Sequence, residues 1–188
     1  MNLNRRGLVL AMVISLVAPG LASAANKAKE QADVRKAGEG ALAAVYKAQP
    51  SARKAVESAA GYAAFSNFGM KILFAGGGSG SGVAVNNQTK KEVFMKMVEV
   101  QAGLGLGVKK FKLVFVFKNQ KALNDFINSG WVAGAQATAA ATTGGQGAAY
   151  QGAASVSPGV WLYQLTDEGL AAEVTVKGTK YYKDDELN

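Results

Sequence analysis

Residues 111–117 read FKLVFVF, and this stretch decides the fold class. Side chains alternate between the two faces of a β-strand. One face of this stretch therefore receives three phenylalanines and a leucine, while the other receives Lys112 and two valines. Because both faces are mainly apolar, we expect a central strand of a sheet, with its aromatic side chains in the core.

Glycine is concentrated in three further stretches, at residues 76–82, 103–107 and 134–152. In the first two, glycine recurs at alternate positions. Alternate glycines in apolar sequence predict strands with one face free of side chains, so that another backbone can approach closely. The sequence therefore indicates a glycine-rich sheet around the aromatic strand.

The first glycine stretch has two interpretations. Consecutive N–H groups of Gly76, Gly77 and Gly78 are a candidate anion nest. A Walker A loop is excluded, because Val83 stands where that motif would continue towards its Gly-Lys-Ser/Thr ending. The alternation that continues to Gly82 is typical of a strand, and it favours structural glycines over a phosphate cradle.

Helical spacing and capping residues predict three helices, over residues 26–49, 52–60 and 120–128. Pro50 ends the first helix because it has no N–H to donate. Ser51 and Asn119 are expected to cap the second and third helices. Gly130 suits the end of the third.

Strands are predicted between and after these helices, with turns at 86–89 and 166–169. The polar residues 180–188 are expected to form a short closing helix. We predict an α+β fold with a glycine-rich, mainly antiparallel sheet or barrel-like core, N-terminal helices and one helix near 120–128. The predicted strands cover residues 62–65, 71–75, 83–85, 92–100, 111–117, 131–141, 160–165 and 170–176.

Residues 1–24 have the pattern of an export signal. Arg5 and Arg6 precede an apolar run, and the small residues 22–24 fit a cleavage site after Ala24. The apolar run is shorter than the ~20 residues of a spanning helix. We expect an exported protein, with the bacterial periplasm as its compartment and residues 25–188 as one domain.

The amino-acid composition excludes several classes of function. The chain has no cysteine and no histidine, which removes disulfides, thiolate metal sites, a cysteine nucleophile and a Ser-His-Asp triad. No pair of carboxylates has a catalytic context, so we predict neither an enzyme nor a cofactor or metal site. The formal charge of +8 favours an anionic partner, and export makes nucleic acid an unsuitable one.

An ordered series of motifs resembles a known family. Gly61-Tyr62-Ala63-Ala64-Phe65 is followed by Lys71, the glycines of 76–82, residues 101–105 (QAGLG) and the LVFVF strand. This series resembles the SYLF domain, in its bacterial, exported branch, from about the second helix to the end of the chain. Ser66 departs from the family pattern, where proline is expected.

The resemblance implies a compact α/β domain that binds membrane lipids. In relatives a basic, amphipathic N-terminal segment is credited with this binding, and residues 26–60 correspond to it here. Acidic residues dilute its charge, and it has few bulky apolar anchors. The basic candidates in this segment are Lys27, Lys29, Arg35, Lys36, Lys47, Arg53 and Lys54.

Further lysines lie outside that segment. Lys109, Lys110 and Lys112 form the densest basic cluster, and Lys71 belongs to the matched motif. Each exposed lysine near an anionic bilayer contributes about 1 kcal/mol. The leading hypothesis is a non-catalytic domain that binds anionic phospholipid. The alternative is a structural protein of the cell envelope that pairs with a protein partner through strand edges.

Overall fold

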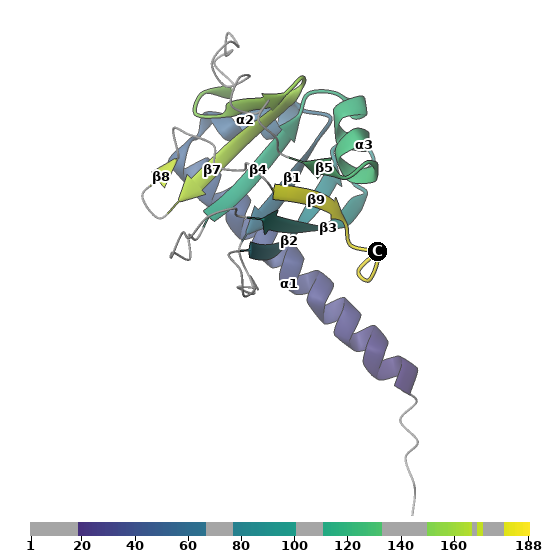
Figure 1. Cartoon of the computed structure of the whole chain (residues 1–188). Coiled ribbons are helices and arrows are strands. Elements are labelled where there is room, and N and C mark those ends of the chain that lie inside the picture. Colours follow the sequence, from purple (N-terminus) through teal and green to yellow (C-terminus); the bar gives the residue numbers. More distant parts are fainter. Residues whose placement is uncertain (1–18, 67–76, 101–110, 133–149, 167–168, 171–178) are drawn as a thin grey trace, which may run out of the picture.

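The computed structural model describes residues 19–66, 77–100, 111–132, 150–166, 169–170 and 179–188. The part described folds into three helices and one antiparallel sheet (Figure 1). The helices are α1 (Pro19–Ala48), α2 (Ser51–Ser58) and α3 (Gln120–Asn128). The strands are β1 (Gly61–Ser66), β2 (Gly77–Asn86), β3 (Glu92–Val100), β4 (Phe111–Phe117), β5 (Trp131–Val132), β6 (Ala154–Ser157), β7 (Val160–Thr166), β8 (Gly169–Leu170) and β9 (Thr179–Lys183).

The sheet runs in the order β5-β9-β3-β2-β1-β4-β7-β6, and β8 pairs with β7. Each pairing described is antiparallel; for example, Ala63 lies opposite Ala84 on β2 and opposite Phe115 on β4. β4 lies between β1 and β7, so the predicted central position of this strand is confirmed. The predicted α+β class with an antiparallel, curled sheet is also confirmed.

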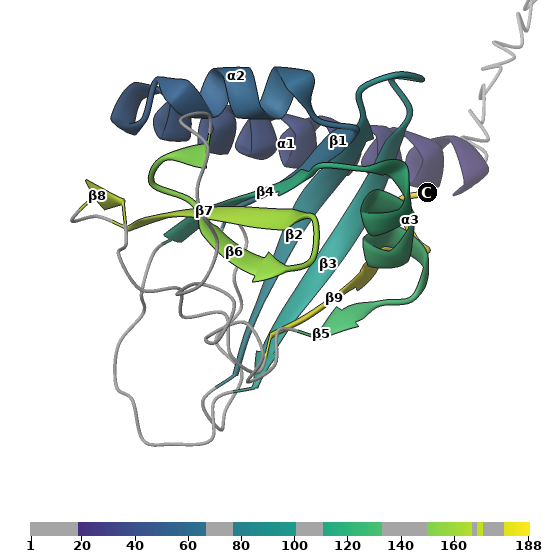
Figure 2. The ribbon, with the colours of Figure 1, turned by 90° about the horizontal axis from the view of Figure 1, so that it is seen from above.

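The outer face of the sheet is covered by α1 and α2, which lie on the opposite side from α3 (Figure 2). α1 crosses the strands and contacts β1, β2, β4 and β7. Its buried positions are small: Val34, Gly38, Ala41 and Val45. Because small side chains hold the helix close to the sheet, a β-carbon at Gly38 would lie 3.0 Å from a methyl group of Val83.

The inner face of the sheet carries the aromatic core. Phe65, Phe115 and Phe126 are almost fully buried there together with Tyr181. The ring centroids of Phe115 and Phe126 are 5.2 Å apart, and those of Phe115 and Tyr181 are 5.0 Å apart. Edge-to-face and tilted contacts of this kind add stability beyond the apolar area that they bury. The predicted aromatic face of β4 therefore lies in the core, as expected.

Glycine at two strand positions makes room for this core. A β-carbon at Gly82 would overlap the Phe65 ring and lie 2.6 Å from the main-chain oxygen of Ala64. A β-carbon at Gly61 would lie 2.7 Å from the side chain of Leu123 on α3. The bare inner face of β2 thus accommodates an aromatic ring, and Gly61 allows α3 to approach the sheet.

The helix predictions are largely confirmed, with one error of capping. The side chain of Asn119 accepts a hydrogen bond from the N–H of Ala122, as expected for a cap. Ser51 is not the cap of α2; it is the first helical residue, and its hydroxyl accepts from Gln49 instead. The α2 carbonyls of Val56 and the following Ala59 accept from the Asn87 side chain.

The predicted closing helix at residues 180–188 is wrong. Residues 179–183 form β9, which pairs with β3. Alternation decides this: Thr179 and Tyr181 are buried, while Lys180 between them is exposed. The predicted strand 71–75, and most of the predicted strands 131–141 and 170–176, lie outside the described residues.

Candidate functional site

Two of the predicted basic residues, Arg35 and Lys27, make contacts that stabilise the fold. The Arg35 Nε lies 2.6 Å from a carboxylate oxygen of Glu92 on β3, and its guanidinium carbon lies 5.0 Å from the centre of the Phe94 ring. Lys27 donates to the main-chain oxygen of Asn188 at 2.8 Å. Both side chains therefore tie α1 to the sheet and to the C-terminal residues, which reduces their availability to an external anion.

Two other candidates have acidic partners on their own helix. Lys29 lies 3.9 Å from Asp33, and Arg53 lies 3.8 Å from Glu57. The Arg53 guanidinium also lies over the Tyr46 ring, at 4.5 Å from its centre. These side chains remain exposed, and exposed pairs at this spacing contribute only a few tenths of a kcal/mol. Such pairs can open when an anionic surface approaches.

Three candidates are exposed and unpaired. Lys36 and Lys47 lie on the side of α1 that faces away from the sheet, and Lys54 lies on α2. Within the described residues, no carboxylate lies within ion-pair distance of any of the three. Among the predicted residues, these have the most freedom to meet an anionic surface.

The remaining predicted residues do not form one site with the helices. Lys112 is half-buried on β4. Lys71, Lys109, Lys110 and Gly76 lie outside the described residues. Gly77 and Gly78 are strand residues of β2, opposite Val100 and Glu99 of β3. That placement agrees with the interpretation of structural glycines.

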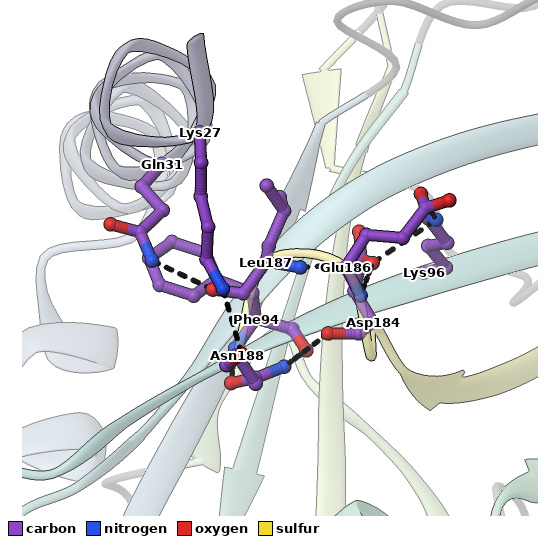
Figure 3. Close-up of polar contacts among 8 residues, drawn as sticks. All are labelled: Lys27, Gln31, Phe94, Lys96, Asp184, Glu186, Leu187 and Asn188. Atoms are coloured by element: carbon purple, nitrogen blue, oxygen red, sulfur yellow. Dashed lines mark hydrogen bonds and ion pairs between the residues drawn. The ribbon is translucent and has the colours of Figure 1, made fainter. Parts of the chain in front are cut away.

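The C-terminal residues join α1 to β3 (Figure 3). Gln31 donates to the main-chain oxygen of Leu187 at 2.7 Å, and the Leu187 side chain packs with Val34 and Phe94. The Asn188 side chain accepts from the N–H of Phe94 at 3.0 Å and donates to the carbonyl of Phe94 at 2.8 Å. Residues at the two ends of the described chain therefore stabilise one another.

A buried carboxylate anchors this junction. Asp184 is 1% exposed and accepts from Lys96 at 3.0 Å and from the N–H of Glu186 at 3.0 Å. Lys96 also contacts the Glu186 carboxylate at 2.8 Å. The hydrogen bond from Lys96 lowers the pKa of Glu186, and the same bond, with the help of Asp184, raises the pKa of Lys96. The network ties β3 to the C-terminal residues.

A small cavity lies beneath α3, and sequence reasoning did not find it. Its volume is about 160 Å³, and it opens between α3, the β2–β3 turn and the end of β9. Its lining comes from segments that are distant in sequence, so no local motif marks it. The lining residues are Asn86, Thr89, Lys91, Val93, Leu123, Asn124, Ile127, Asn128 and Lys183.

Two kinds of feature, a metal-binding cluster and a membrane-spanning helix, are absent from the described residues. No cluster of three or more carboxylates, histidines or cysteines able to hold a metal ion is found there. In the same part of the chain, no helix combines the length and the apolar character needed to cross a bilayer.

These features define a class of protein: a single curled antiparallel sheet, with a long helix on one face and an aromatic core on the other. Residues 98–188 match the family model Ysc84, described as "Las17-binding protein actin regulator", which is the SYLF domain family. The resemblance to the SYLF family predicted from the sequence is thereby confirmed. This family is lipid-binding in general, and it is generally non-catalytic.

A curated relative supports the same family. Beta cell expansion factor A of Aeromonas veronii is 29% identical over 147 residues, which are 78% of this chain and 54% of the relative. The chain therefore spans about half the length of that relative. The likeness extends the family match into the part of the chain that precedes residue 98.

Proposed function

We propose that this protein is an exported domain that associates with anionic membrane surfaces and has no catalytic role. The observation that carries the proposal is the set of exposed basic side chains on the outer helices, above all Lys36, Lys47 and Lys54. The family match supports it, because SYLF domains bind lipid in general. Export rests on the signal pattern of residues 1–24.

The expected strength of binding follows from these charges. Three lysines at an anionic surface contribute about 3 kcal/mol together, which corresponds to roughly a hundredfold preference over a neutral surface. The exposed face of α1 and α2 presents alanine, glycine and charged residues in place of the tryptophan, phenylalanine or leucine of interfacial helices. Binding is therefore electrostatic, reversible and weakened by salt.

Vesicle co-sedimentation tests the proposal. The predicted mature form, residues 25–188, is mixed with vesicles of phosphatidylglycerol and phosphatidylcholine, or of phosphatidylcholine alone, at low and high salt. We expect binding to the anionic vesicles alone, and its loss at high salt. Binding to neither composition at low salt contradicts the proposal and directs attention to a protein partner in the envelope.

A matched pair of variants locates the surface. The triple substitution Lys36→Gln, Lys47→Gln and Lys54→Gln removes three charges from the outer helices. The control, Lys118→Gln, Lys121→Gln and Lys180→Gln, removes the same charge from other exposed positions. We expect the first variant to lose most of its vesicle binding and the control to retain it. Equal losses would indicate that net charge, and not the helical surface, determines the association.

A further inference from the structure

We propose that the cavity beneath α3 binds a phosphate group carried on a small ester, such as the phosphorylated head of a lipid or a soluble phosphate ester. The inference that a lipid supplies this phosphate group rests on the membrane association proposed above. α3, which lines the cavity, lies on the opposite side of the sheet from α1 and α2 (Figure 2), so the cavity is separate from the basic residues of the outer helices.

Strand alternation brings the cationic side chains to the cavity. On β3, Val93 and Met95 belong to the inner core, and Lys91 directly precedes the strand, two residues before Val93. On β9, Lys183 lies opposite Met95 and shares the side of buried Tyr181. Lys91 and Lys183 both line the cavity, although more than 90 residues separate them in the sequence. Two lysines thus line one small space.

The amide side chains of the lining present donors. The Asn86 side-chain oxygen already accepts from the N–H groups of Gln88 and Thr89, at 2.9 and 3.0 Å. The Asn124 side-chain oxygen accepts from the Gln120 side chain at 3.3 Å. The Asn86 oxygen thus uses both of its lone pairs, which leaves its NH₂ group as the end of that amide that can donate to a ligand. The Asn124 NH₂ group is a second donor of the same kind.

The charge of the lining is of one sign. It holds two lysines and no carboxylate among the described residues. Two nearby carboxylates are engaged elsewhere: Glu92 contacts Arg35, and Asp125 contacts Lys121, each at 2.6 Å. In the described part of the chain, no acidic group lies within ion-pair distance of Lys91 or Lys183. An anion would therefore meet unpaired lysines.

The size of the cavity limits its ligand. Pockets for drug-sized molecules measure about 300–1,000 Å³, whereas this one measures about 160 Å³. It accommodates a head group but not an acyl chain. Val93, Leu123 and Ile127 form an apolar part of the lining, which suits the carbon backbone of an ester better than a bare ion. A glycerol phosphate group combines these properties.

Amide NMR titration of the purified protein tests the proposal, with inorganic phosphate and glycerol 3-phosphate as probes. We expect saturable shifts of signals from the β2–β3 turn and α3, with tighter binding of the ester. The double variant Lys91→Gln/Lys183→Gln should lose affinity at least tenfold. The control Lys90→Gln/Lys118→Gln removes two exposed lysines outside the lining and should bind as the native protein does.

Two results would overturn the proposal: shifts that do not saturate, or equal affinity in the native protein and the lining variant. The second would mean that the lysines only complement the C-terminal end of the α3 dipole. Thermal unfolding of each variant checks that the fold is retained.

Vesicle co-sedimentation separates this proposal from the preceding one. Loss of glycerol 3-phosphate binding in the lining variant, with vesicle binding unchanged, supports the cavity as a site for a soluble ester. Weaker binding of that variant to phosphatidic acid vesicles supports a lipid as the source. Absence of vesicle binding by the native protein contradicts membrane association, while saturable ester binding would still support the cavity.

Discussion

The two faces of the sheet are stabilised in different ways. The inner face buries interlocking aromatic rings, including Phe65, Phe115 and Tyr181. The outer face holds α1 through small residues, together with polar contacts from Lys27, Gln31 and Arg35 on its N-terminal half. Both faces therefore bury aromatic side chains, because Trp161 and Tyr163 are buried beneath the outer helices, and the outer face adds these specific polar contacts. The side of α1 that faces away from the sheet carries exposed charged residues, among them Lys36 and Lys47.

Truncation of the inner core should have the largest effect. Phe115→Ala removes a fully buried ring that contacts four other aromatic rings. Burial and cavity costs predict a loss of about 4 kcal/mol in the free energy of unfolding. Val45→Ala, on the outer face, should cost clearly less, because it removes fewer buried atoms. Urea unfolding of both variants measures the comparison, and equal losses would contradict the proposed division between the faces.

A methyl group on the bare face of β2 should have the next largest effect. Gly82→Ala places a β-carbon against the Phe65 ring and the main-chain oxygen of Ala64, which cannot move without disturbing the sheet. Overpacking predicts a loss of about 3 kcal/mol. Gly40→Ala is the matched control, because nothing lies within 4 Å of that position on α1. The control should stabilise the protein by up to about 1 kcal/mol through helix propensity.

Loss of the buried carboxylate should weaken the outer face. Asp184→Asn keeps the shape of the side chain but removes its charge next to Lys96. Because hydrogen bonds to charged groups contribute about 1.5–3 kcal/mol, we expect a loss of about 2 kcal/mol. In this variant, amide hydrogen exchange should accelerate more in the N-terminal half of α1 than in α3, relative to the native protein. Equal acceleration in both helices would mean that Asp184 stabilises the whole fold and not this junction.

The smallest effect should depend on pH. Lys96 lowers the pKa of Glu186 below its ordinary value of 4.5, so their bond stabilises the folded state above that pH. The contribution is lost as the pH falls through the lowered pKa. Glu186→Gln should therefore be slightly less stable than the native protein at pH 7, and the difference should disappear as the pH falls below the lowered pKa of Glu186. Glu30→Gln, which changes an exposed residue on α1, should show no such convergence.

The stabilisation by the Lys96–Glu186 pair also has an upper pH limit. Lys96 has a raised pKa, so its own contribution is present below its ordinary value of 10.5 and is lost as the pH rises through the raised value. Urea midpoints of the native and Glu186→Gln proteins across this range test both limits. A difference between them that does not vary with pH would contradict the role of the ion pair.

Local patterns account for the elements that sequence reasoning predicted well. Alternation in FKLVFVF identified β4 and its aromatic face, and Asn119 with Gly130 marked the two ends of α3. Such signals lie within a few residues of one another, so the chain displays them directly. The Ser51 cap failed because the helix begins one residue earlier than predicted, with Pro50 in the cap position and Ser51 already helical.

The candidate site was only partly predictable. The basic residues of the first helix were visible in the sequence, but their availability was not. Arg35 is engaged by Glu92, which lies 57 residues further along the chain, whereas Lys36 is left exposed beside it. Adjacent residues on a helix point about 100° apart, and the position of the sheet decides which one is used for packing.

By itself, the sequence determined the class of fold, the aromatic strand, the capped third helix and the basic character of the N-terminal segment. These follow from local periodicity and from the chemistry of single residues. The tertiary structure alone decided that residues 179–183 form a strand, that Asp184 is buried beside Lys96, and that Lys91 and Lys183 share a cavity. Each of these depends on pairing between segments more than 80 residues apart, and no local signal encodes the register of such pairing.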